Sequence, residues 1–98
     1  MARSLWVARL IISEATAEKL SAKHGLDHRE VRNAIVGITG LTYAWHDDPE
    51  RGRRALVEVW LGDRRCIAVL YPVDDTAGDT YALGSAYPGD TLPTVEAS

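Results

Sequence analysis

The sequence predicts one small α+β domain, in which two short N-terminal helices pack on one face of an antiparallel sheet. Two helix-forming segments come early and adjacent to each other, four strand-like segments follow them, and polar turns separate the strands. Consecutive strands joined by short turns form an antiparallel meander, and helices that precede it together cover one of its faces. We therefore expect the order β-α-α-β-β-β-β in a single domain at residues 1–88, with a flexible tail at 89–98.

The first strand and the first helix are predicted next to each other. Residues 6–12 are apolar and end in β-branched side chains, which is typical of a strand. Ser13 is a preferred N-cap, residues 14–23 are good helix formers, and Gly25 fits the position just after a helix end.

A second helix is predicted to begin at Asp27. Glu30 follows three residues later, which is the spacing of a capping box, and glycines at 37 and 40 mark the end. Apolar residues recur at helical spacing and predict a buried stripe of Val31, Ala34, Ile35 and Ile38. Because both helices are short, we expect them to be stable only when packed on the sheet.

Four more strands are expected, at residues 41–46, 53–61, 64–71 and 80–87. Gly62-Asp63 stands between the two strongest of them and indicates a two-residue hairpin turn. The sequence leaves open whether the first strand lies at the edge or in the middle of the sheet.

The hairpin turn predicts which residues share a face of the sheet. Counting outward from Gly62-Asp63 places Val59 opposite Cys66 and Val57 opposite Ala68, on an apolar face that should lie under the helices. The opposite face, called the mixed face below, pairs Trp60 with Arg65, Glu58 with Ile67, Leu56 with Val69, and Arg54 with Tyr71. Its apolar members would form an exposed patch of the kind that usually marks an interaction site. A register slip of one residue would exchange the two faces.

The composition excludes several classes of function. Cys66 is the single cysteine and lies in an apolar run, so it is expected to be a buried hydrophobe rather than a nucleophile. Arg9 interrupts the apolar start and no apolar run is long enough to span a membrane, which predicts a cytoplasmic protein. No phosphate loop, dinucleotide fingerprint or zinc-ligand spacing is present, so no metal and no cofactor are expected.

The net charge of −3 is unevenly distributed along the chain. Residues 1–71 hold all 11 Lys and Arg together with 9 acids, a net charge of +2, whereas residues 72–98 hold 5 acids and no Lys or Arg. A net charge of +2 is not the basic footprint of a strong RNA binder.

The order and spacing of several short motifs over residues 12–88 resemble a known family. These motifs are Ile12-Ser13-Glu14-Ala15, Lys23-His24-Gly25-Leu26, Asp27-His28-Arg29-Glu30-Val31, the polar turn at 47–52, and Leu83-Gly84-Ser85-Ala86. Together they are similar to the RelE/ParE superfamily of small bacterial toxins, and most similar to BrnT-like toxins and related uncharacterised RelE-fold domains.

The resemblance implies the toxin component of a type II toxin–antitoxin system, a metal-independent endoribonuclease that acts on messenger RNA. It implies a cognate antitoxin as partner, RNA or the ribosome as target and no membrane partner, and it leaves a homodimer open. Basic and aromatic side chains of the sheet would bind the phosphate and move protons. The alternative is a non-catalytic RelE-fold module that binds a partner protein, or itself, through the mixed face.

Four residues are candidates for catalysis. Arg54 and Arg65 can bind phosphate, or can stack as solvated arginines on neighbouring rings. Glu58 lies among apolar residues and can be a general base, or can pair with an arginine. His46, beside two aspartates, can transfer protons or be a surface turn residue. The candidates for substrate or partner binding are Trp60, Tyr71, Leu56, Ile67, Val69 and Tyr87.

Overall fold

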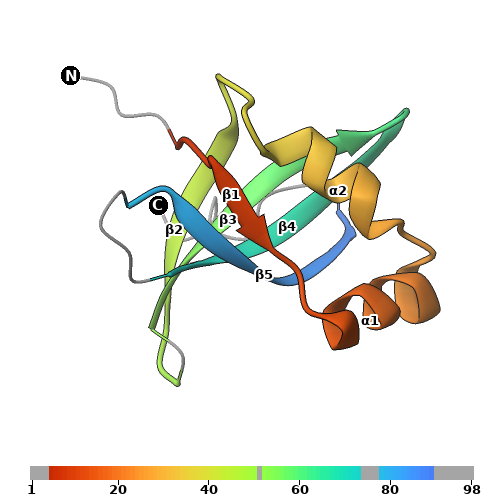
Figure 1. Ribbon diagram of the computed structural model, residues 1–98, viewed down its shortest axis with the longest axis horizontal. Coiled ribbons are helices and arrows are strands. Elements are labelled where there is room, and N and C mark those ends of the chain that lie inside the picture. Colours follow the sequence, from red (N-terminus) through yellow and green to blue (C-terminus); the bar gives the residue numbers. More distant parts are fainter. Residues whose placement is uncertain (1–4, 51, 74–77, 90–98) are drawn as a thin grey trace.

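A computed structural model describes residues 5–50, 52–73 and 78–89, which form two helices and one five-stranded sheet (Figure 1). The elements follow one another as β1 (Arg9–Ile11), α1 (Glu14–His24), α2 (His28–Ile35), β2 (Thr42–Asp48), β3 (Gly52–Leu61), β4 (Arg64–Pro72) and β5 (Thr80–Pro88). The α+β class and the predicted element order are confirmed. Apart from Gly89, the predicted tail lies outside the described residues. Neither of the two helices is long and apolar enough to cross a membrane.

Both helices begin at the residues predicted to cap them. Ser13 Oγ accepts a hydrogen bond from the backbone N–H of Thr16 (3.1 Å), and Asp27 Oδ1 accepts one from the backbone N–H of Arg29 (2.9 Å). The helix α1 ends at Gly25, whose φ of 64° lies in the left-handed region that glycine adopts without strain.

The end of α2 corrects one prediction. The helix stops at Ile35, with Val36 as its C-cap, so helical spacing no longer applies further along the chain. Val31 and Ile35 are buried as expected, but Ile38 is exposed.

The sheet has the strand order β1-β5-β4-β3-β2 and is mixed rather than wholly antiparallel. The strands β2 to β5 form the expected antiparallel meander, whereas β1 runs parallel to β5. The helices carry the chain from β1 to the far edge of the sheet, and the meander then returns until β5 lies beside β1 (Figure 1).

The hairpin of β3 and β4 has the predicted register. Gly62 lies in the turn with a φ of 69°, Trp60 pairs with Arg65, and Val59 pairs with Cys66. The two faces of the sheet therefore carry the residues that the sequence assigned to them.

The main core lies between the sheet and the helices. Leu20 of α1 and the buried Val31 and Ile35 of α2 pack on the apolar residues of β3, β4 and β5. Cys66 is part of this core, which confirms that it is a buried hydrophobe. Burial raises the pKa of its thiol, which disfavours the reactive thiolate.

The mixed face is covered where the sequence predicts an exposed patch. Leu56 is 1% exposed, Ile67 is 0% exposed and Val69 is 5% exposed, and two tyrosine rings pack on the cluster that they form. Trp60 alone among the four is exposed, at 56%. The expectation of a contiguous exposed patch is therefore wrong. The rings of Tyr71 and Tyr87 pack on the aliphatic side chains of this face.

The two helices occupy different places on the sheet. The helix α2 packs over β3, whereas α1 packs against β5 (Figure 1). The contact with α1 lies beyond the three residues of β5 that pair with β1. At the end of α1, the ring centroid of His24 lies 6.5 Å from that of Tyr87 on β5. Because α1 lies along the border of the sheet, its side chains can reach the mixed face.

Candidate functional site

A hollow of about 380 Å3 lies on the mixed face of the sheet. Its floor includes the buried residues Leu56 and Val69, and its walls include the two tyrosines packed on them. Lysine, arginine and histidine also line it, which combines an apolar floor with a few convergent polar groups. The lining residues are Lys19, His46, Arg54, Leu56, Val69, Tyr71, Gly84, Ser85 and Tyr87.

Arg54 is held in this hollow by three neighbours. Its Nε donates a hydrogen bond to Nδ1 of His46 (3.1 Å), its strand partner on β2. Its Nη1 donates to the hydroxyl of Tyr71 (3.4 Å) and lies 3.5 Å from Oδ2 of Asp48. None of these three contacts uses Nη2. A bound anion can therefore accept hydrogen bonds from the two N–H groups of Nη2.

The contact with Arg54 indicates which nitrogen of the neutral His46 ring carries the proton. Because the guanidinium donates, Nδ1 must carry a lone pair, and the proton of the neutral ring is then on Nε2. A ligand that draws Arg54 away therefore frees Nδ1 to accept a proton.

A bulge in β5 positions Tyr71. Gly84 is an extra residue where the pairing of β4 with β5 shifts between Val69 and Leu70. A Cβ atom on Gly84 would lie 2.4 Å from Cε2 of Tyr71. The φ of Gly84 is not in the left-handed region, so glycine is needed for space and not for backbone freedom. The bulge lets the ring lie close to the sheet, with its hydroxyl beside Arg54.

We expect Gly84→Ala to displace the Tyr71 ring and to lower the free energy of unfolding by about 1–3 kcal/mol, as overpacking does. Urea denaturation measures this difference. In a Tyr71→Leu background the same change should cost much less, because no ring remains to collide with the new methyl group. An equal cost in both backgrounds would show that the methyl group meets something other than Tyr71.

Lys19 reaches the hollow from outside the sheet. It is an exposed residue of α1, and it lines the hollow because α1 packs against β5. In the sequence it is one of two lysines in an ordinary helix, and nothing there indicates a site. The structure thus adds Lys19, together with Gly84, Ser85 and the Arg54 partner Asp48, to the candidate residues.

Two of the four catalytic candidates lie apart from the hollow. Arg65 Nε donates to Oε2 of Glu58 in an ion pair, and Arg65 Nη1 donates to the carbonyl oxygen of Gly89 (2.8 Å). Each charge compensates the other, and neither residue lines the hollow. The structure therefore brings His46 and Arg54 together and leaves Glu58 and Arg65 as a separate pair.

The six binding candidates are divided in the same way. Tyr71, Tyr87, Leu56 and Val69 line the hollow. Ile67 is fully buried and does not line it, and Trp60 lies exposed near the hairpin turn.

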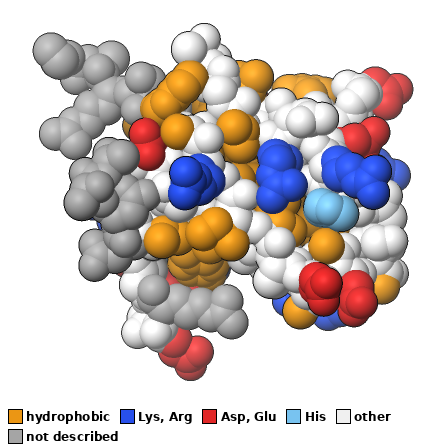
Figure 2. Space-filling model, viewed as in Figure 1, with side chains coloured by type: hydrophobic (Ala, Val, Ile, Leu, Met, Phe, Trp, Pro, Cys, Tyr) orange, Lys and Arg blue, Asp and Glu red, His pale blue; other side chains and the backbone are white. Residues whose placement is uncertain are grey.

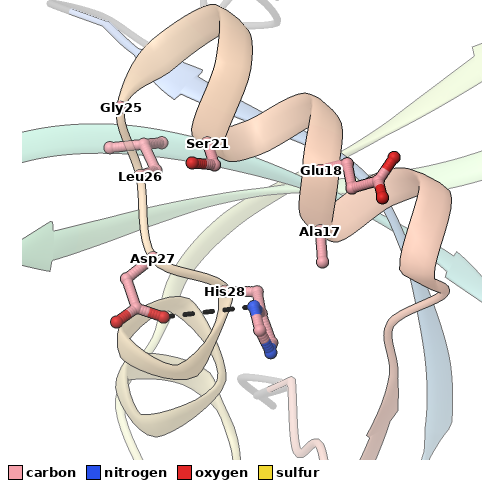
Figure 3. Close-up of a pocket in the computed structure, with 7 residues that line it drawn as sticks. All are labelled: Ala17, Glu18, Ser21, Gly25, Leu26, Asp27 and His28. Atoms are coloured by element: carbon pink, nitrogen blue, oxygen red, sulfur yellow. Dashed lines mark ion pairs between the residues drawn. The ribbon is translucent and has the colours of Figure 1, made fainter.

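A second hollow lies between α1 and α2 and is lined by seven residues (Figure 3). It contains Asp27 and His28, whose Oδ1 and Nδ1 atoms are 4.0 Å apart. The same carboxylate caps α2, and Figure 3 shows the Glu18 carboxylate directed away from both residues. The Asp27 carboxylate therefore serves the helix cap, and the polar side chains of this second hollow do not converge on one point.

Within residues 5–50, 52–73 and 78–89, no three His, Cys, Asp or Glu side chains come together as a metal site. No protein-family model, no curated protein and no solved structure matches this chain.

Proposed function

We propose that this chain is a metal-independent RNA endonuclease and the toxin component of a type II toxin–antitoxin system. The contact between Arg54 and His46 over the hollow carries the proposal, because it joins a phosphate-binding cation to a group that can accept a proton. These are the two functions that attack by the ribose 2′-OH requires of a protein without a metal. The resemblance of the chain to RelE/ParE toxins supports the same class of reaction.

Binding of RNA would switch the hydrogen bonds of Arg54. A phosphate is a stronger acceptor for a guanidinium than a neutral imidazole, because it carries a negative charge and two of its oxygens can accept parallel N–H···O bonds from the guanidinium. A phosphate that accepts from Nη2 and Nε together draws Nε away from His46, and Nδ1 of His46 becomes free. The substrate itself thus produces the general base.

The reaction is a transfer within the RNA chain. His46 Nδ1 takes the proton of the 2′-OH, the 2′-oxygen forms a bond to phosphorus, and the bond from phosphorus to the 5′-oxygen breaks. The 5′-oxygen takes a proton from water, and the imidazolium gives its proton to the hydroxide that remains. The products are a 2′,3′-cyclic phosphate and a 5′-hydroxyl end, while Arg54, Lys19 and the Tyr71 hydroxyl stabilise the charge on the phosphate.

The proposal is tested with purified protein and a single-stranded 20-nucleotide RNA in the presence of EDTA. We expect fragments that end in a 2′,3′-cyclic phosphate, and no cleavage at a position where a 2′-deoxy sugar replaces the ribose. We also expect that expression of the chain alone arrests growth and that a cognate antitoxin relieves the arrest. A folded protein that leaves RNA intact, or cleaves it only after metal is added, contradicts the proposal.

A further inference from the structure

We infer that the hollow takes a single nucleotide of single-stranded RNA, with its base between Tyr71 and Tyr87 and one phosphate at Arg54. This inference rests on the proposed function and specifies how much of the RNA the protein recognises. It means that the remainder of an RNA chain makes little contact with the described surface.

The two tyrosines stand on either side of the hollow floor. Tyr87 pairs with Ile67 on β4, so it stands four positions along that strand from Tyr71, about 13 Å at a rise of about 3.3 Å per residue. Val69 lies midway between these positions and belongs to the floor. Both rings are partly buried on the floor cluster, and both line the hollow. A base placed over Val69 therefore has a tyrosine on each side and can contact these rings by offset stacking or by edge-to-face packing.

The size of the hollow matches a small ligand. Its volume of about 380 Å3 lies near the lower end of the range of about 300–1,000 Å3 that small-molecule sites occupy. A hollow of this volume has room for about one nucleotide unit and is too small to follow a backbone over several nucleotides.

The charges near the hollow also point to few phosphate contacts. Among the residues that the structure describes, Arg54 and Lys19 are the two cations that line it, and Arg54 is partly compensated by Asp48 at 3.5 Å. Arg65, on the same face, is paired with Glu58. The whole chain has a net charge of −3. These groups can neutralise one or two phosphates.

The side of the molecule shown in Figure 2 offers no alternative path for RNA. Lysine and arginine side chains form separate groups there, with hydrophobic side chains between them and acidic side chains nearby (Figure 2). The described surface on that side has no continuous basic track, which a protein that follows the backbone over several nucleotides needs.

The inference is tested by binding of probes that cannot be cleaved: a dinucleotide with a 2′-deoxy sugar before the phosphate, and a 20-nucleotide strand with 2′-deoxy sugars throughout. We expect the dinucleotide to bind within about 10-fold of the longer strand after correction for the number of sites. Each neutralised phosphate contributes about −0.7 to the slope of log affinity against log salt, so we expect a slope between about −0.7 and −1.4.

Two variants separate the parts of the site. Tyr87→Leu should weaken dinucleotide binding by about 10-fold with an unchanged salt slope, because it removes stacking and no charge. Lys19→Gln should make the slope shallower by about 0.7 if this lysine contacts a phosphate. The matched control is Trp60→Leu, an exposed aromatic residue of the same face that does not line the hollow.

Binding of the long strand alone, with a slope steeper than about −3, would overturn the inference, because it indicates several phosphate contacts. Equal weakening by Tyr87→Leu and Trp60→Leu, or no binding of either probe, would also overturn it. The proposed function is separable from these outcomes. If the protein binds the dinucleotide but cleaves no RNA, the single-nucleotide site is supported and the nuclease function is rejected. If cleavage requires long RNA and binding shows a steep salt slope, the nuclease function is supported and the single-nucleotide site is rejected.

Discussion

Replacement of Arg54 by glutamine should lower the rate of RNA cleavage about 100-fold to 1,000-fold, which is the usual cost of removing one group that stabilises charge in a transition state. The same replacement at Arg53 should leave the rate near that of the wild type. The two arginines are neighbours on β3 and point to opposite faces of the sheet. Arg53 stacks over the Trp45 ring at 4.5 Å on the other face, whereas Arg54 lines the hollow. Single-turnover cleavage with protein in excess measures both rates.

The comparison controls for charge and for position in the sequence, because both variants remove one arginine from the same strand. Urea denaturation shows whether each variant is folded. His46→Gln should cause a loss of similar size, and the double variant should lose little more than either single one, since both residues act in one step. Equal losses in the Arg53 and Arg54 variants, or none in either, would rule out the Arg54 site.

Ile67→Ala should lower the free energy of unfolding by about 2–5 kcal/mol, although its side chain is on the face of the sheet opposite α2. The side chain is fully buried beneath the residues of the mixed face, so its removal loses apolar burial and leaves a cavity. The loss is a large part of the total stability of about 5–15 kcal/mol that small domains have. The midpoint and slope of urea denaturation provide the measurement.

Trp60→Ala is the matched control, because it removes a larger side chain from the same face. Trp60 is 56% exposed, and substitutions at exposed positions usually change stability by about 0.5 kcal/mol or less. If Ile67→Ala does not fold, Ile67→Val should still cost about 0.5–1.5 kcal/mol. A greater cost for Trp60→Ala than for Ile67→Ala would mean that the mixed face is exposed as the sequence alone suggests.

The local features of the fold could be predicted from the sequence because each depends on residues close together in the chain. Ser13 and Asp27 cap helices through hydrogen bonds to residues two or three positions later. Gly25 and Gly62 lie at positions with positive φ, which glycine tolerates best. The position of Gly62 in the turn was sufficient to predict the register of the hairpin and thus the two faces of β3 and β4.

The candidate site could be predicted only in part. Counting from the hairpin turn assigned Arg54 and Tyr71 to the mixed face, and the structure places both in the hollow. The same counting assigned Glu58 and Arg65 to that face and allowed Glu58 to pair with an arginine, but it did not decide whether the partner is Arg65 or Arg54. An alternating pattern gives the direction of a side chain and does not show which neighbour it contacts.

The sequence by itself determined the α+β class, the order of the elements, the start of both helices, the end of α1 and the faces of the central hairpin. Only the tertiary structure decided that β1 joins β5 in parallel, that the aliphatic residues of the mixed face are buried, and that Lys19 meets His46, Arg54 and Tyr87 at one hollow. The reason is physical. Caps and turns depend on interactions within a few residues, whereas the hollow exists because α1 and four strands pack together, and residues distant in the chain then enclose a common space.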